Sequence, residues 1–169
     1  ANDSAELAAV IAHEMGHVTA NHGLQRQQKE AEEVLATKVV TDVLGPDVVA
    51  WGSHLFAKQA GDTKEVPLHQ DGVYWPLTPS RTVTVWLAVD DADAANGAMQ
   101  FVPGSHLHGE LPHQQLDLDG SRVLGRQVTD PDRFGDRFTN ELRAGQVSLH
   151  SDLLLHGSGP NRSDRRRAG

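Results

Sequence analysis

The chain has 169 residues, a formal net charge of −8 and 22% charged residues, a length that suits one domain. The acidic balance argues against a general nucleic-acid binder, which usually carries a basic face. The chain has no cysteine, which excludes disulfides and thiolate metal sites and fits a reducing, cytoplasmic location. No apolar run reaches membrane-spanning length and nothing resembles a signal peptide, so we expect no membrane partner. Ten histidines are many for this length and invite a search for metal ligands.

The first part of the chain reads as helix. Ser4 is a plausible N-cap, and apolar residues recur after it at helical spacing. Residues 25–33 are rich in Gln, Lys and Glu, as in a solvated helix, and 34–44 form a second apolar helical segment. The dipeptide Gly45-Pro46 is expected to end it.

Beyond Pro46 the pattern changes to short strands separated by turn residues. The clearest strand is predicted at 82–89, where β-branched and aromatic residues cluster, and Asn96-Gly97 indicates a tight turn. Many short strands separated by turns favour a barrel or sandwich, so the predicted fold is mainly β with N-terminal helices. Further strands are predicted at 48–56, 98–102, 146–150 and 153–156, with a polar, irregular excursion at 107–140.

Three residues could form a metal site: His69, Asp71 and the distant His156. Two imidazoles and one carboxylate on one face of a metal are the facial triad of non-haem Fe(II) oxygenases. In an extended segment residues i and i+2 point to the same side, so His69 and Asp71 can reach one ion. The spacing alone occurs often by chance, and a surface loop would explain it equally well. We interpret the nearby His150 as structural, outside the ligand set.

Two blocks around these residues carry a family resemblance. The run HQDGVYWPLTPSRTVTVWLAVDDADAANGAMQFVPGSH, followed by LRAGQVSLHSDLLLHGSGPNRSDRRR, resembles the phytanoyl-CoA dioxygenase family, and the resemblance covers about 34–169. It implies a double-stranded β-helix, the jelly-roll or cupin-like barrel. It also implies a dioxygenase that uses Fe(II), 2-oxoglutarate and O2 to hydroxylate a small organic substrate.

The resemblance assigns roles to particular residues. It implies that His69, Asp71 and His156 are the iron ligands. Relatives that halogenate carry a small residue at the position of Asp71, so its presence here implies hydroxylation. The arginine that pairs with the far carboxylate of 2-oxoglutarate matches Arg167, although Arg165 and Arg166 compete if the match shifts by one or two residues. Three further positions match contacts to this cosubstrate: Ser158, Trp86, for which a core aromatic is the alternative, and Lys58.

Residues 13–17 read His-Glu-Met-Gly-His. On a helix, His13 and His17 share one face and can bind zinc, with Glu14 as general base. The flanks resemble the active-site helix of HtpX-like zinc metalloproteases, which also need a third protein ligand and a substrate-aligning strand. Since the sequence departs from that pattern after about Glu33, we predict two units: a fused or fossil protease-like segment at 1–33 and the oxygenase domain at 34–169. A zinc metallopeptidase is the alternative function.

The end of the chain bears on activity. In the family, the arginine matched by Arg167 begins a barrel strand, and this sequence ends at Gly169. We therefore expect a barrel truncated at its C-terminal strand and an oxygenase that can be incomplete. An inactive metal-binding fragment is the third alternative.

Overall fold

The computed structural model describes residues 38, 40–42, 44–49, 52–75, 77–78 and 81–169. Residues 38, 40–42 and 44 are helical, which agrees with the helix predicted at 34–44. The predicted helix before it, with the His13–His17 motif, lies outside the described residues. In the part of the chain that is described, no helix combines the length and the apolar character needed to cross a membrane.

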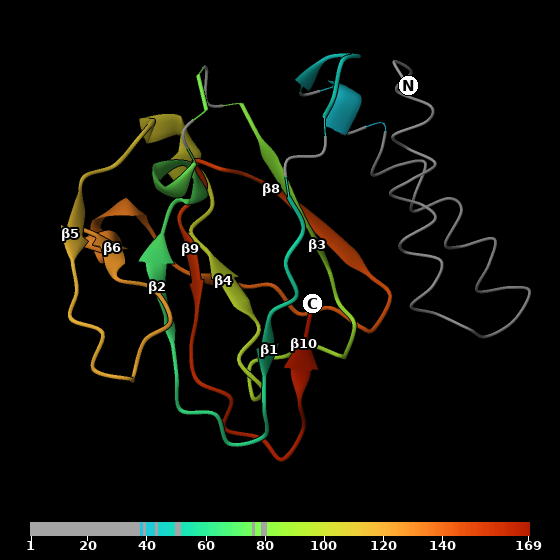
Figure 1. The fold of residues 1–169 in the computed structure, drawn as a ribbon, viewed down its shortest axis with the longest axis vertical. Helices are drawn as coiled ribbons and strands as arrows, with labels where there is room; N and C mark the ends of the chain where they lie inside the picture. Colours follow the sequence, from blue (N-terminus) through green and yellow to red (C-terminus); the bar gives the residue numbers. More distant parts are fainter. Residues whose placement is uncertain (1–37, 39, 43, 50–51, 76, 79–80) are drawn as a thin grey trace, which may run out of the picture.

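The described chain contains two facing antiparallel layers of short strands (Figure 1). One layer pairs β3 with β8 and β1 with β10, and the amides of Val89 and Asp90 join these pairs by donating to the Ala168 carbonyl. The other layer has the order β2-β9-β4-β7. The strands of the first layer are β1 (Ala57–Lys58), β3 (Val83–Leu87), β8 (Val147–Ser151) and β10 (Arg167–Ala168). Those of the second are β2 (Val66–His69), β4 (Met99–Phe101), β7 (Phe138–Thr139) and β9 (His156–Ser158).

Side chains from both layers meet in the middle. The rings of Phe101 on β4 and His150 on β8 lie 5.1 Å apart, centroid to centroid. One apolar cluster contains Leu68, Val102, Leu111, Val128 and Leu155, and a smaller one surrounds Trp86 with Ala88, Ala92 and Ala98. The layers are short and the clusters small, so much of the interior between the sheets is left to polar side chains.

Close packing of β2 against β9 depends on a glycine. A Cβ on Gly157 would lie 2.6 Å from the Val66 carbonyl oxygen, nearer than nonbonded atoms approach. Only glycine therefore allows the backbone next to His156 to lie so close to β2. The predicted turn at Asn96-Gly97 is confirmed, with Gly97 at a φ of +77° that favours glycine.

Two strand predictions and the predicted irregular excursion need correction. Residues 48–49 and 52–56 are not a strand, and Leu55 and Phe56 are largely exposed. Residues 153–156 are mostly a turn, and the strand begins only at His156. The excursion at 107–140 is not simply irregular, because it contains β5 (His113–Gln115), β6 (Arg126–Val128), β7 and the 3-10 helix η3 (Pro131–Phe134), and it starts in η2 (Ser105–His108). Apolar composition alone does not reveal whether a segment finds a strand partner, and short polar strands carry no alternating pattern.

Candidate metal centre

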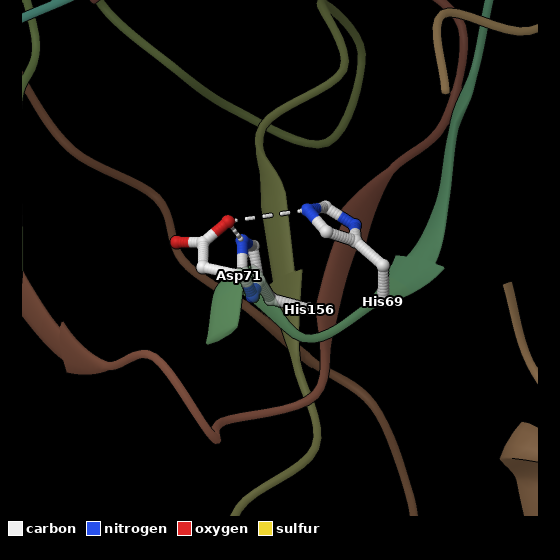
Figure 2. Close-up of side chains that lie close together, drawn as sticks. All are labelled: His69, Asp71 and His156. Carbon is white, nitrogen blue, oxygen red and sulfur yellow. Dashed lines mark ion pairs between the residues drawn. The ribbon is translucent and has the colours of Figure 1, made fainter. Parts of the chain in front are cut away.

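The structure brings the three predicted metal ligands together (Figure 2). His69 ends β2, Asp71 begins the 3-10 helix η1 (Asp71–Tyr74), and His156 begins β9. Asp71 Oδ1 lies 3.4 Å from His69 Nε2 and 3.6 Å from His156 Nε2. One donor atom from each residue lies within 4.8 Å of the others, so one ion can contact all three.

Each of the two histidines forms a hydrogen bond through Nδ1 with a backbone carbonyl. The Nδ1 atom of His69 lies 2.8 Å from the Pro67 oxygen, and that of His156 lies 2.8 Å from the Leu154 oxygen. A carbonyl can only accept, so Nδ1 donates in each ring and Nε2 is the nitrogen that faces Asp71 and would bind a metal. This is the arrangement that orients imidazoles toward a metal.

Asp71 lies against two cross-strand neighbours in the opposite layer, and one of them forms a hydrogen bond with it. Thr84 on β3 donates to Asp71 Oδ2 at 2.9 Å, and His150, paired with Thr84 across β3 and β8, has Nε2 3.7 Å from the same oxygen. Burial raises the pKa of Asp71, but the imidazoles of His150, His69 and His156 more than offset this and hold the pKa well below its usual range. The carboxylate is therefore charged, with Oδ1 directed to the histidines.

The Thr84 contact yields a prediction. Replacing Thr84 with valine keeps the shape of the side chain and removes the hydrogen bond to Asp71. Loss of such an outer partner typically costs ~10–100-fold in metal affinity or activity, and we expect Fe(II) affinity to fall by that amount, as measured by equilibrium metal titration. Thr139→Val on β7 is the matched control. Equal Fe(II) affinity in both variants would show that Thr84 does not orient Asp71.

Burial of His156 predicts a pH dependence for the metal-free protein. Burial, together with the charges of His69 and His150, lowers the pKa of His156 to about 3, so the folded state keeps neutral a group that the unfolded chain protonates below about pH 6.5. The free energy of unfolding is expected to fall by up to ~1.4 kcal/mol per pH unit from about 6.5 downward. Urea unfolding at several pH values measures it, and the decline should be smaller in His156→Gln. A free energy that stays constant between about pH 7 and 5 would contradict the prediction.

Gln70 lies between two of the ligands, and its importance was missed in the sequence. Its side chain is fully buried, donates to the carbonyls of Gly109 and Leu153, and accepts from the Leu111 amide. The amide thus joins the segment carrying His69 and Asp71 to the loop before His156. Alternation along the extended backbone places His69 and Asp71 on one side and Gln70 on the other. This pattern could have predicted that Gln70 points away from the metal site into the protein.

The four predicted cosubstrate residues are all buried. Lys58 and Arg167 are partners across β1 and β10, and neither makes an ion pair with a carboxylate among the described residues. Lys58 Nζ donates to the Gly159 carbonyl, next to Ser158, at 2.5 Å. Burial, and then the charge of Arg167, lowers the pKa of Lys58 to about 8. The Arg167 guanidinium donates to the Gly97 carbonyl and lies 5.4 Å from the centre of the Trp86 ring.

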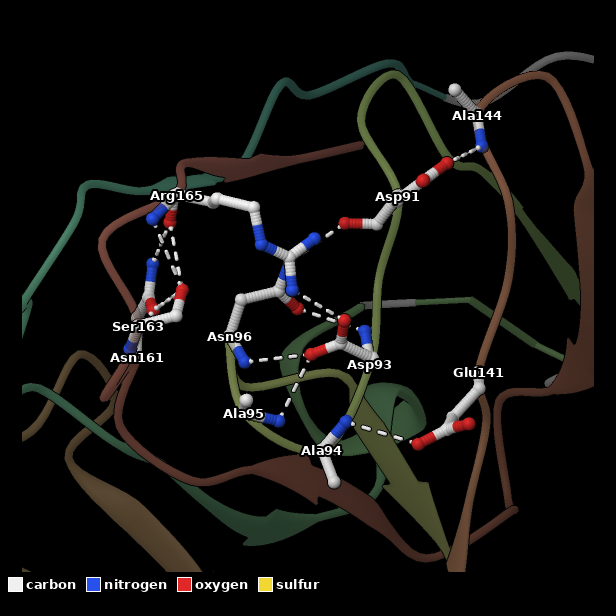
Figure 3. Close-up of polar contacts among 10 residues, drawn as sticks. All are labelled: Asp91, Asp93, Ala94, Ala95, Asn96, Glu141, Ala144, Asn161, Ser163 and Arg165. Atoms are coloured by element: carbon white, nitrogen blue, oxygen red, sulfur yellow. Dashed lines mark hydrogen bonds and ion pairs between the residues drawn. The ribbon is translucent and has the colours of Figure 1, made fainter.

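The two competing arginines point elsewhere. Arg165 is exposed and pairs with Asp93 at 2.5 Å, within the polar network of Figure 3. Arg166 is also exposed and forms a two-pronged pair with Asp90, at 2.7 and 2.9 Å. Arg167 alone of the three directs its charge into the interior without a carboxylate partner among the described residues.

The residues present fit a catalytic non-haem metal. The donor set is two imidazoles and one carboxylate, which would leave other positions on a six-coordinate ion open. Both nitrogens of His150 are buried without a hydrogen-bond partner, close to Asp71. Buried polar atoms are rarely left unpaired, so these nitrogens favour a further group in the space that the triad faces.

Sequence and structure comparisons agree with this geometry. The profile of the family described as phytanoyl-CoA dioxygenase (PhyH) matches residues 2–169. The chain belongs to the phytanoyl-CoA dioxygenase family. Bovine peroxisomal phytanoyl-CoA dioxygenase is 30% identical over 131 residues, 75% of this chain and 39% of that protein. A probable alpha-ketoglutarate-dependent hypophosphite dioxygenase of Stutzerimonas stutzeri is 35% identical over 107 residues, 60% of this chain and 36% of that protein.

Solved structures of the same kind confirm the fold. The non-heme monooxygenase ThoJ shares 34% identity at a TM-score of 0.64, covering 80% of this chain and 48% of its own. EvdO2 of Micromonospora carbonacea var. aurantiaca, complexed with 2-oxoglutarate, shares 25% identity at a TM-score of 0.57, covering 68% and 46%. The predicted double-stranded β-helix is therefore confirmed. This chain spans less than half the length of each of these four relatives.

The comparisons leave the N-terminal prediction open. The family profile begins at residue 2, whereas the resemblance noted in the sequence begins at about 34. The boundary between 1–33 and 34–169, and the zinc-binding role of His13, Glu14 and His17, stay predictions. They fall on residues outside the described part of the chain.

Proposed function

We propose that this chain is the core of a non-haem Fe(II), 2-oxoglutarate-dependent dioxygenase that hydroxylates a small organic substrate. The observation that carries the proposal is the convergence of His69 Nε2, Asp71 Oδ1 and His156 Nε2, each held by a partner behind it. These three residues would hold Fe(II). When bound, the metal with 2-oxoglutarate and O2 supplies the oxidising chemistry, and the protein contributes ligand geometry and a shielded site.

We place the cosubstrate between the triad and the pair Lys58 and Arg167. On β3, Thr84 contacts Asp71 while Trp86, two residues on and on the same face, contacts Arg167. On β9, His156 and Ser158 are related in the same way. On each strand, the residue at the metal site and the residue near Lys58 and Arg167 are two positions apart, which is about 7 Å along an extended backbone. This separation suits a five-carbon dicarboxylate bound at both ends.

Each proposed contact has a chemical reason. Arg167 donates from Nε and Nη2 to the Gly97 carbonyl. Its remaining N–H groups are free to bind the far carboxylate of 2-oxoglutarate in a bidentate manner. Lys58 adds positive charge at the same end, Ser158 can donate its hydroxyl, and Trp86 forms a wall that excludes water. Two buried cations without a carboxylate partner among the described residues are costly, and a bound dianion would offset that cost.

Asp71 favours hydroxylation. Its carboxylate occupies the position that a halide would need on the metal, and Thr84 holds it in place. The direct test measures succinate and CO2 formation from 2-oxoglutarate by the full chain with Fe(II) and O2. We expect turnover that stops when Fe(II) is chelated. Turnover that is unaffected by chelation would contradict the proposal.

We also propose a reducing, cytoplasmic location and small-molecule partners, without nucleic acid or membrane. The absence of cysteine and the acidic charge of the chain support this. The segment 1–33 is proposed to be a protease-like unit without peptidase activity. Proteolysis of casein that survives His69→Ala and is lost in Glu14→Gln would contradict that proposal.

A further inference from the structure

A cavity of about 360 Å³ lies beside the metal ligands. Its walls are Gly72 and Val73 of η1, residues 110–113, Gln115 and Arg126 of β6. We name it the Arg126 pocket. Ligand pockets range over about 300–1,000 Å³, so its volume suits a small metabolite.

The Arg126 pocket shares its wall with the metal site. Gly72 and Val73 directly follow Asp71 in the chain, and the next residue, Tyr74, places its ring edge-on to His69 with centroids 5.9 Å apart. On the other side, His113 Nε2 accepts from the Gln70 amide at 3.3 Å. An occupant of the pocket would therefore contact the segment that carries two of the three proposed ligands.

Arg126 gives the Arg126 pocket its chemistry. Its Nη1 donates to the Val73 carbonyl at 3.2 Å, and its guanidinium lies 5.9 Å from the centre of the Tyr74 ring. These contacts fix the group in place but use one nitrogen only. Among the described residues no carboxylate, Glu110 of the same pocket included, lies within the 4.0 Å of an ion pair. A fixed guanidinium with free donors matches a carboxylate, phosphate or sulfate group.

We propose that the Arg126 pocket binds the primary substrate, a small compound whose anionic group is held by Arg126. That the bound anion is a substrate rests on the proposed dioxygenase function, whereas the presence of an anion site does not. Arg126 lies on β6 and Arg167 on β10, in different sheets. Substrate and 2-oxoglutarate therefore use separate cations and do not compete.

The anion site can be tested on the full chain loaded with Zn(II), a non-reactive stand-in for Fe(II), and with 2-oxoglutarate. Inorganic sulfate is the probe, and the amide NMR signals of Gly72, Val73, Leu111 and His113 are followed. We expect saturable shifts, with affinity at least ~10-fold lower in Arg126→Gln and partly kept in Arg126→Lys. Arg137→Gln, which removes an exposed arginine paired with Asp132, is the matched control and should bind sulfate like the wild type.

The outcomes separate the two proposals. Absence of saturable shifts at these amides, or equal sulfate affinity in wild type and Arg126→Gln, would overturn the anion site. Failure of 2-oxoglutarate to shift the amides of Ser158 and Arg167 would count against the proposed function alone. If Arg126→Gln does not fold, weakened binding in Arg126→Lys still supports the site, and unchanged binding in that variant overturns it.

The substrate class has its own test with Fe(II) and O2. Small carboxylates and phosphate esters are compared with their uncharged amides and triesters for stimulation of succinate formation. We expect stimulation by the anions only, lost in Arg126→Gln and kept in Arg137→Gln. Stimulation by the uncharged compounds alone would overturn the assignment of an anionic substrate.

Discussion

Replacing His69 with alanine is expected to abolish Fe(II)-dependent succinate formation. Loss of an outer-shell partner already costs ~10–100-fold, and removing a direct ligand costs more, because the two remaining donors bind Fe(II) weakly and do not fix its coordination geometry. The same loss is expected for Asp71→Ala and His156→Ala. Fe(II) affinity is measured by equilibrium titration and turnover by succinate release.

The matched control is His106→Ala, which removes an exposed histidine of η2. It should keep both Fe(II) affinity and turnover. Circular dichroism of the His69→Ala protein checks that the β fold is retained. Full turnover in any of the three ligand variants would contradict the assignment of that residue to the metal.

Replacing Arg167 with alanine is expected to remove 2-oxoglutarate binding while Fe(II) binding remains. Truncating one partner of a buried charged pair costs ~2–5 kcal/mol, so we expect the KM for 2-oxoglutarate to rise at least ~30-fold. Arg167→Lys should recover part of this, because a point charge replaces the fork. Retention of Fe(II) affinity in Arg167→Ala would show that the variant is folded and that only 2-oxoglutarate binding is weakened.

Arg166→Ala is the matched control, since it removes the neighbouring side chain and only an exposed pair with Asp90. Exposed ion pairs contribute ~0–1 kcal/mol, so its KM should stay close to that of the wild type. A large rise in Arg166→Ala or Arg165→Ala, with little change in Arg167→Ala, would show that another arginine binds 2-oxoglutarate.

The first two proposed metal ligands could be predicted from the sequence because their placement depends on local backbone geometry. Alternation along an extended backbone places His69 and Asp71 on one side, and the backbone of Gln70 between them is extended, with φ −112° and ψ 135°. The distant His156 came from the family resemblance, since nothing local joins residues so far apart in the chain. Burial of Arg167 next to the exposed Arg165 and Arg166 was likewise not predictable from the sequence. Three adjacent arginines look alike in the sequence, and only the pairing of β10 with β1 distinguishes them.

Other features arise only when the two sheets face each other. Thr84 and His150 are ordinary strand residues in the sequence, and they meet Asp71 through the pairing of β3 with β8. The same cause explains the error at 48–56, where the apolar composition predicted a strand, whereas of the described residues only Phe56 pairs with another segment, through two backbone hydrogen bonds with Gly169. Pairing is a property of the whole fold, and residue preferences describe it weakly.

The most direct test of the central claim is an anaerobic titration of the full chain with Fe(II) and then 2-oxoglutarate, followed by visible absorption. A 2-oxo acid that chelates Fe(II) gives a metal-to-ligand charge-transfer band. We predict this band at one equivalent of iron, its absence in His69→Ala, and a much higher 2-oxoglutarate concentration to reach it in Arg167→Ala. A wild-type chain that binds Fe(II) without developing the band, or a band that persists unchanged in His69→Ala, would contradict the assignment.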